Sequence, residues 1–232
     1  MKTLKLVFVP ASKIELIRKI EETILNNGND CDLNFIDVSN ITDMSHLFED
    51  SEFDGCISWW NTSNVINMSF MFDNSSFNGD ISNWDVRNVI NFDGAFEYSE
   101  FRGDISNWNV CNVKYMNSMF YKSKFNGNIS KWNVAKVSDM SYMFHKSKFN
   151  KNINNWNTKS LISMKSMFED SIFNKPLKNW KVCRVSDFTA AFENSKFKQN
   201  ISNWKIRSSS RVYNIFKNCD IKDCYKPMLP IN

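Results

Sequence analysis

Seven tryptophans recur at an unbroken spacing of 24 residues, and this spacing constrains the fold more than any other feature of the chain. The series is Trp60, Trp84, Trp108, Trp132, Trp156, Trp180 and Trp204. Two phenylalanine series keep the same step, one from Phe48 to Phe216 and the other from Phe53 to Phe197. An exact repeat of this length is typical of a stacked repeat protein, in which no unit can bury its apolar residues alone.

Each repeat carries two different apolar patterns. Trp84 and Val86 alternate with polar neighbours, which is typical of a short half-buried strand. Val65, Met68 and Phe72 lie at a spacing that favours one or two helical turns. Stacking would set the strands side by side at about 4.8 Å. The sequence therefore predicts an α/β repeat solenoid, a leucine-rich-repeat-like right-handed superhelix with a short-stranded parallel sheet on one face and short helical turns on the other.

The repeat also follows a recognisable consensus. It reads I-S-x-W-N/D-V-x-x-V-x-x-M-x-x-M-F-x-x-S-x-F-N-x-D/N, and the segment 37–44 looks like its first copy. This pattern resembles that of the BspA-like leucine-rich-repeat proteins, over about residues 33–221. The resemblance implies a leucine-rich-repeat fold and a role in protein–protein binding or adhesion. It implies no shared catalytic residues.

The ends of the chain depart from the repeat and divide it into three parts. Residues 1–35 are expected to form an N-terminal cap, with a strand over Thr3–Pro10 and an amphipathic helix that begins after Ser12 and ends near Asn27 and Gly28. Residues 36–221 hold an array of about eight repeats. Residues 222–232 form a C-terminal tail or cap.

The N-terminal segment bears on the location of the protein. Its apolar run, Leu6 to Val9, is shorter than the roughly 7–15 residues of a signal-peptide core. We therefore expect a cytoplasmic protein; the alternative is a surface or secreted one, as for many members of the resembled family. No apolar stretch is long enough for a membrane span. The six cysteines form no CxxC motif and are expected to be free thiols, although Cys219 and Cys224 are close enough in sequence to pair.

The sequence offers no arrangement of residues typical of an enzyme. Its two histidines, His46 and His145, belong to no metal-binding pattern and accompany no nucleophile–base set. A ladder of turn residues, Asp80, Asp104, Asn128 and Asn152, could suggest calcium, but hydrogen bonding within the turns is the better interpretation. We expect no catalytic residues, no metal and no cofactor.

A repeat scaffold without catalytic residues predicts a binding module. The aromatic columns are assigned to the core, with Trp59 as the exception, because it stands beside Trp60 on the opposite strand face. The outward strand positions are the candidate contacts with a protein partner. They are Trp59, Asn83, Asp85, Arg87, Asn107, Asn109, Lys131, Asn133, Lys159, Lys181, Lys205 and Arg207.

The net charge of +4 hides a strong asymmetry along the chain. Residues 1–116 hold eight Lys and Arg against 18 Asp and Glu, a formal charge of −10, whereas residues 117–232 hold 21 against seven, a charge of +14. Such asymmetry can steer a charged partner. The alternative function is nucleic-acid binding through the basic C-terminal half. The protein is expected to be a monomer or to associate weakly head to tail.

Overall fold

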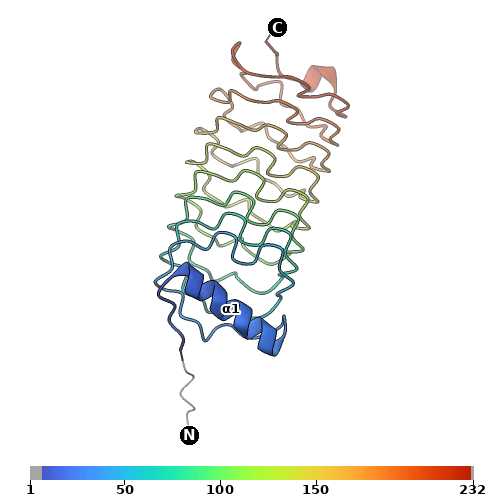
Figure 1. Ribbon diagram of the computed structural model, residues 1–232. Helices are drawn as coiled ribbons and strands as arrows, with labels where there is room; N and C mark the ends of the chain where they lie inside the picture. The colour runs from blue at the N-terminus through green and yellow to red at the C-terminus, as the bar shows by residue number, and fades with distance from the viewer. Residues whose placement is uncertain (1–6, 231–232) are drawn as a thin grey trace.

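The chain winds into a stack of coils, one coil for each 24-residue repeat. The computed structural model describes residues 7–230, and Figure 1 shows the coils lying on one another from the N-terminal to the C-terminal end. Isolated parallel bridges join each coil to the next at the same position, from Asp43 with Asn67 through to Asp187 with Arg211. The 24-residue spacing of the sequence is therefore the length of one coil.

One α-helix closes the N-terminal end of the stack, as the sequence predicts. Helix α1 (Lys13–Asn27) begins after Ser12, whose side chain accepts a hydrogen bond from the Glu15 amide, and ends at Gly28. Leu16 and Ile20 on its inner face are buried. The predicted strand before it is described only from Val7, and there Phe8 forms a single bridge to Ile36; Thr3–Leu6 lie outside the described residues.

The C-terminal end carries one short element, the 3-10 helix η1 (Asp223–Tyr225). None of the described helices is long and apolar enough to cross a membrane.

The predicted α/β class is wrong. Residues 7–230 contain isolated bridges in place of a parallel sheet, and α1 is their one α-helix. The segment around Trp84 and Val86, predicted to be a strand, makes no backbone hydrogen bond to a neighbouring coil; Trp84 N–H instead closes a turn on Ile81. The segment around Met68 and Phe72, predicted to be helical, is a run of turns.

Those turns carry most of the hydrogen bonds between coils. The amides of Met68, Phe70 and Phe72 donate to carbonyls in the next coil at 2.8–3.0 Å, every second residue, as along a strand. Between them the chain turns, because Phe70 and Asn74 have left-handed backbones with φ of 54° and 50°. The same two positions are left-handed in every repeat from His46 to Asn218. Alternation of turns with left-handed residues interrupts both a regular strand and a helix.

The core consists of continuous aromatic columns, as predicted. The Trp column is only 2–4% exposed, and the Phe53-to-Phe197 column is fully buried. Rings of the Phe53 column stack almost parallel at 6.1–6.3 Å between centroids. Four of the pairs formed by neighbouring Trp residues in the column stack in the same manner at 6.2–6.5 Å. This spacing exceeds the roughly 4.8 Å between paired strands, which fits the absence of a backbone ladder along the Trp segment.

Candidate functional site

The twelve residues predicted to contact a partner lie in three columns along the Trp side of the coil stack. Eleven have exposed side chains and Asp85 is half-buried. Trp59 is the most prominent, with 77% of its surface exposed while its neighbour Trp60 is buried. Its amide donates to Asn34 Oδ1 in the preceding coil at 2.8 Å. The outward orientation predicted for these positions is therefore correct, and their contact with a partner stays a prediction.

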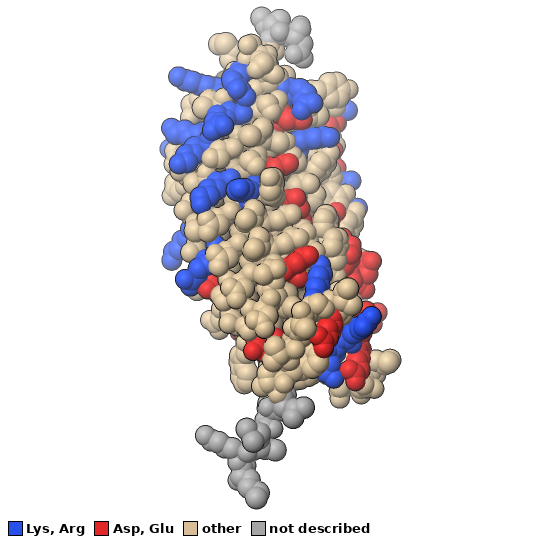
Figure 2. Space-filling view, turned by 60° about the vertical axis from the view of Figure 1, so that its left-hand side comes forward, with Lys and Arg blue, Asp and Glu red and all other residues tan. Residues whose placement is uncertain are grey.

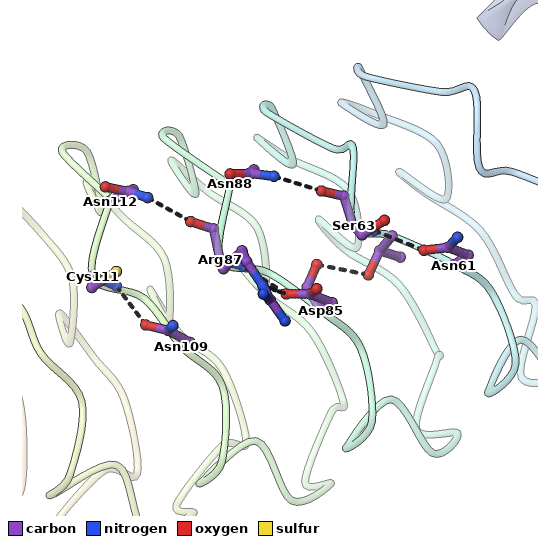
Figure 3. Close-up of polar contacts among 9 residues, drawn as sticks. Asn61, Ser63, Asp85, Arg87, Asn88, Asn109, Cys111 and Asn112 are labelled. Carbon is purple, nitrogen blue, oxygen red and sulfur yellow. Dashed lines mark hydrogen bonds and ion pairs between the residues drawn. The ribbon is translucent and has the colours of Figure 1, made fainter.

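Several of these polar side chains already have a local role. The Oδ1 atoms of Asp85, Asn109 and Asn133 each accept a hydrogen bond of 3.2–3.3 Å from the amide two residues later, which forms a turn. Asp85 also pairs with Arg87 Nε at 2.8 Å (Figure 3). These oxygens shape the backbone, so they are poorly available as acceptors for a ligand.

A second series of asparagines, absent from the sequence prediction, joins the coils on this side. The Nδ2 groups of Asn64, Asn88 and Asn112 donate to backbone carbonyls one coil earlier at 2.8 Å, two of them to Ser63 and Arg87 (Figure 3). Their 24-residue spacing was the available signal. These side chains supply hydrogen bonds between coils on the side where backbone bonds are missing.

The C-terminal half of the Trp side carries a group of basic residues that we call the basic ribbon. Lys131 and Lys151 line one shallow groove of about 540 Å³, and Lys178, Lys181 and Lys205 line another of about 650 Å³. No carboxylate lines either groove. The whole ribbon comprises Lys131, Lys151, Lys159, Lys178, Lys181, Lys205 and Arg207.

No residue of the basic ribbon makes an ion pair with a described carboxylate, whereas several other basic residues of the same half do. Elsewhere in this half, Lys196 and Lys198 approach Asp220 at 4.0 and 3.6 Å, and Lys217 pairs with Glu193 at 3.0 Å. Figure 2 shows Lys and Arg gathered along one edge towards the C-terminal end, whereas Asp and Glu are more frequent towards the N-terminal end. The ribbon is thus a region of uncompensated positive charge on a firmly packed scaffold.

A column of titratable residues follows the turn segment, half a repeat away from the Trp column. It contains Glu49, Asp73, Glu97, Tyr121, His145, Glu169, Glu193 and Lys217. Burial, with the charges of Glu49 and Asp50, raises the pKa of Asp73 to about 6. Burial and then the charge of Asp73 raise the pKa of Glu97 to about 7. Burial also raises the pKa of Tyr121 to about 12.

His145 and its acidic neighbours form the densest part of this column. His145 Nδ1 lies 3.3 Å from Glu169 Oε2, and its Nε2 lies 4.0 Å from Asp170 Oδ2. The ring is 6% exposed, and burial lowers the pKa of the imidazole against the opposing effect of Glu169. The sequence prediction did not find this cluster.

The remaining predictions about polar residues concern turns and thiols. Asp80, Asp104, Asn128 and Asn152 each accept the amide hydrogen two residues later at 2.9–3.1 Å, so hydrogen bonding within turns is confirmed for them. All six cysteines are free, Cys219 and Cys224 included.

Comparison with known proteins shows one family. The model of the family DUF285, described as a Mycoplasma protein of unknown function, matches residues 18–129 and 121–224. These matches include most of the chain, and the protein belongs to this family. No curated protein and no solved structure matches it.

Proposed function

We propose that this member of the DUF285 family is a non-catalytic repeat scaffold that binds an acidic protein partner through the basic ribbon. The main support for this proposal is that the seven residues of the ribbon make no ion pairs with the described residues. Lys196, Lys198 and Lys217, which lie outside the ribbon, do pair with carboxylates. Unpaired positive charge in adjoining grooves attracts an anionic surface and speeds its encounter.

The rigidity of the scaffold supports the same proposal. Trp180 and Trp204 form the floor of the larger groove, and both are buried in the stacked column. The lysines therefore extend from a backbone that is held by the core. Binding to such a preorganised surface costs less ordering of the protein than binding to a mobile loop. The resemblance of the repeat to BspA-like proteins, which implies protein binding or adhesion, points in the same direction.

Nucleic acid is the second candidate, because an unpaired basic surface also suits phosphates. Single-stranded nucleic acids are usually held by stacking of bases on aromatic side chains. Here both Trp in the larger groove are 3% exposed and unsuited to stacking. We therefore favour a protein partner over a single-stranded nucleic acid, and a duplex is the alternative that the experiment below tests.

A binding experiment with defined probes tests the proposal. Fluorescence anisotropy would compare a labelled poly-glutamate peptide with a labelled DNA duplex over a range of salt concentrations. The double variant Lys181→Glu, Lys205→Glu should weaken peptide binding by more than about tenfold and reduce the salt dependence. The matched control Lys196→Glu, Lys198→Glu makes the same change in net charge at lysines beside Asp220, and it should change binding by less than about threefold.

Equal weakening by both double variants would show attraction to net charge alone and would refute the ribbon as a site. Tighter binding of the duplex than of the peptide at the same salt concentration would favour the nucleic-acid alternative.

A further inference from the structure

The 24-residue spacing places His145 close to the carboxylates of Glu169 and Asp170, in the adjacent coil. His145 and Glu169 are equivalent residues of adjacent coils, and Asp170 follows Glu169. One ligand atom from each of the three residues lies within 4.8 Å of the other two. Within the described residues this is the one group of three His, Cys, Asp or Glu side chains with such spacing.

The buried imidazole lacks a hydrogen bond where one is expected. His145 is 6% exposed, and its Nδ1 atom has no hydrogen-bond partner among the described residues. Nδ1 faces Glu169 Oε2 at 3.3 Å, but in a geometry that does not form a hydrogen bond. Buried polar atoms in folded proteins are nearly always satisfied, so an unsatisfied ring nitrogen that faces the Glu169 carboxylate indicates a missing partner between the two.

We propose that His145, Glu169 and Asp170 form a binding site for a divalent transition-metal ion of the Zn²⁺ class. One imidazole nitrogen and two carboxylate oxygens are a ligand set that Zn²⁺ accepts, with a fourth position left for water. Tetrahedral bonds of about 2.0–2.2 Å place neighbouring ligand atoms roughly 3.3–3.6 Å apart. The 3.3 Å between His145 Nδ1 and Glu169 Oε2 fits this separation.

Asp170 Oδ2 lies nearest the other ring nitrogen, Nε2, at 4.0 Å, so the Asp170 side chain must turn towards Nδ1 to complete the site. Its carboxylate now lies 3.6 Å from Lys146 Nζ, in a pair whose lysine is 44% exposed. Exposed pairs of this kind contribute little, so giving up the pair with Lys146 costs little. The imidazole is also held in place, because the Tyr121 ring stacks on it at 4.9 Å. A fixed ring plane is what supporting residues provide at known metal sites.

In the proposed site His145 offers a ring-nitrogen lone pair to the metal ion. The competing arrangement is a protonated His145 that pairs directly with Glu169. The two arrangements differ in one observable, because only the first binds a metal ion.

His46 provides a matched control, since it is the other histidine of the chain. Its Nδ1 atom already forms a 2.7 Å hydrogen bond with Glu49, and its side chain is 50% exposed. His46 is therefore also a histidine beside a glutamate, but its Nδ1 atom already has a hydrogen-bond partner, and no third ligand among the described residues lies near it.

Isothermal titration of the full chain, free of affinity tags, with ZnCl₂ at pH 7.5 tests the site. The unaltered chain and His46→Gln should each bind one ion with equal affinity. His145→Gln and Glu169→Gln should lose more than about tenfold in affinity. Because His145 is buried and its variant could unfold, the half-buried Glu169 keeps the test decisive, with circular dichroism as the check on folding.

Cobalt distinguishes this site from the free thiols. Co²⁺ bound to the unaltered chain should show no thiolate-to-metal charge-transfer band, because the proposed ligands are nitrogen and oxygen. Such a band, an absence of Zn²⁺ binding, or Zn²⁺ affinity unchanged by Glu169→Gln would each overturn the proposal.

Discussion

The indole Nε1 of Trp132 donates a 3.0 Å hydrogen bond to the backbone carbonyl of Ile105, in the preceding coil. That carbonyl also accepts the amide hydrogen of Trp108 at 3.2 Å, so it joins two coils at one point. The same side-chain bond recurs for all seven tryptophans of the column, at 3.0–3.1 Å. On this side of the stack, hydrogen bonds from indole groups therefore join the coils in place of backbone hydrogen bonds.

Trp132→Phe should lower the free energy of unfolding by about 2–3 kcal/mol. The substitution removes the bond to Ile105 and leaves a cavity between the stacked rings. Denaturant unfolding monitored by circular dichroism measures the change. Trp59→Phe is the control, because Trp59 is 77% exposed and lies outside the column, and its effect should be under about 0.5 kcal/mol. Equal effects of the two substitutions would contradict a special role for the column.

The core could be predicted from the sequence, but the backbone could not. Burial repeats with the spacing of the apolar residues, so Trp84 and Phe72 are where the 24-residue period places them. The hydrogen bonds depend on left-handed residues, which are normally recognised by glycine or asparagine. Here Phe70 and Tyr142 occupy such positions, with φ of 54° and 58°. The apolar spacing consequently suggested a helix where the chain forms turns.

Leu16→Ala should destabilise the protein by about 2–4 kcal/mol, because Leu16 of α1 is fully buried against the first coils. Without this contact the helix would dock less firmly on the N-terminal end of the stack. Thermal unfolding compared with Leu25→Ala tests this contribution, since Leu25 lies on the same helix and is 86% exposed. A loss of stability as large for the exposed Leu25→Ala would contradict docking as the cause, because alanine itself favours a helix.

Glu97→Gln should stabilise the protein at pH 8 by about 1–2 kcal/mol, after allowance for partial exposure. Burial, together with the charge of Asp73, raises the pKa of Glu97 from 4.5 to about 7 in the folded state. Folded protein therefore retains a proton that the unfolded chain loses between these values. Ionisation destabilises the fold increasingly as the pH rises through this window.

The gain from Glu97→Gln should accordingly shrink as the pH falls and vanish near pH 4.5. Thermal unfolding of both proteins from pH 4.5 to 8 gives the difference directly. Glu100→Gln, an exposed substitution in the same coil, controls for the loss of one negative charge. A gain that does not depend on pH would exclude the ionisation of Glu97 as its cause.

The candidate sites show a similar division between what the sequence could and could not predict. Outward positions such as Lys181 and Lys205 follow from alternation with the buried Trp column. His145 and Glu169 were missed because their segment was interpreted as helical, where residues 24 positions apart have no defined relation. Once the coil length is known, the same spacing makes them neighbours. Whether Lys146 pairs with Asp170 depends on side-chain geometry that no periodicity specifies.

Two adjacent alanines test the left-handed positions of the turn segment. Ala190 has φ of 55°, whereas its neighbour Ala191 is not among the left-handed residues, and both are buried. Replacing either alanine by glycine removes a buried methyl group and makes the unfolded chain more flexible. Together these two effects lower the free energy of unfolding by about 1–2 kcal/mol. At position 190 the relief of the left-handed strain, about 1–2 kcal/mol, offsets this cost. Ala190→Gly should therefore be nearly neutral in denaturant unfolding and Ala191→Gly clearly destabilising; equal losses would contradict the left-handed turns on which the stacking of the coils depends.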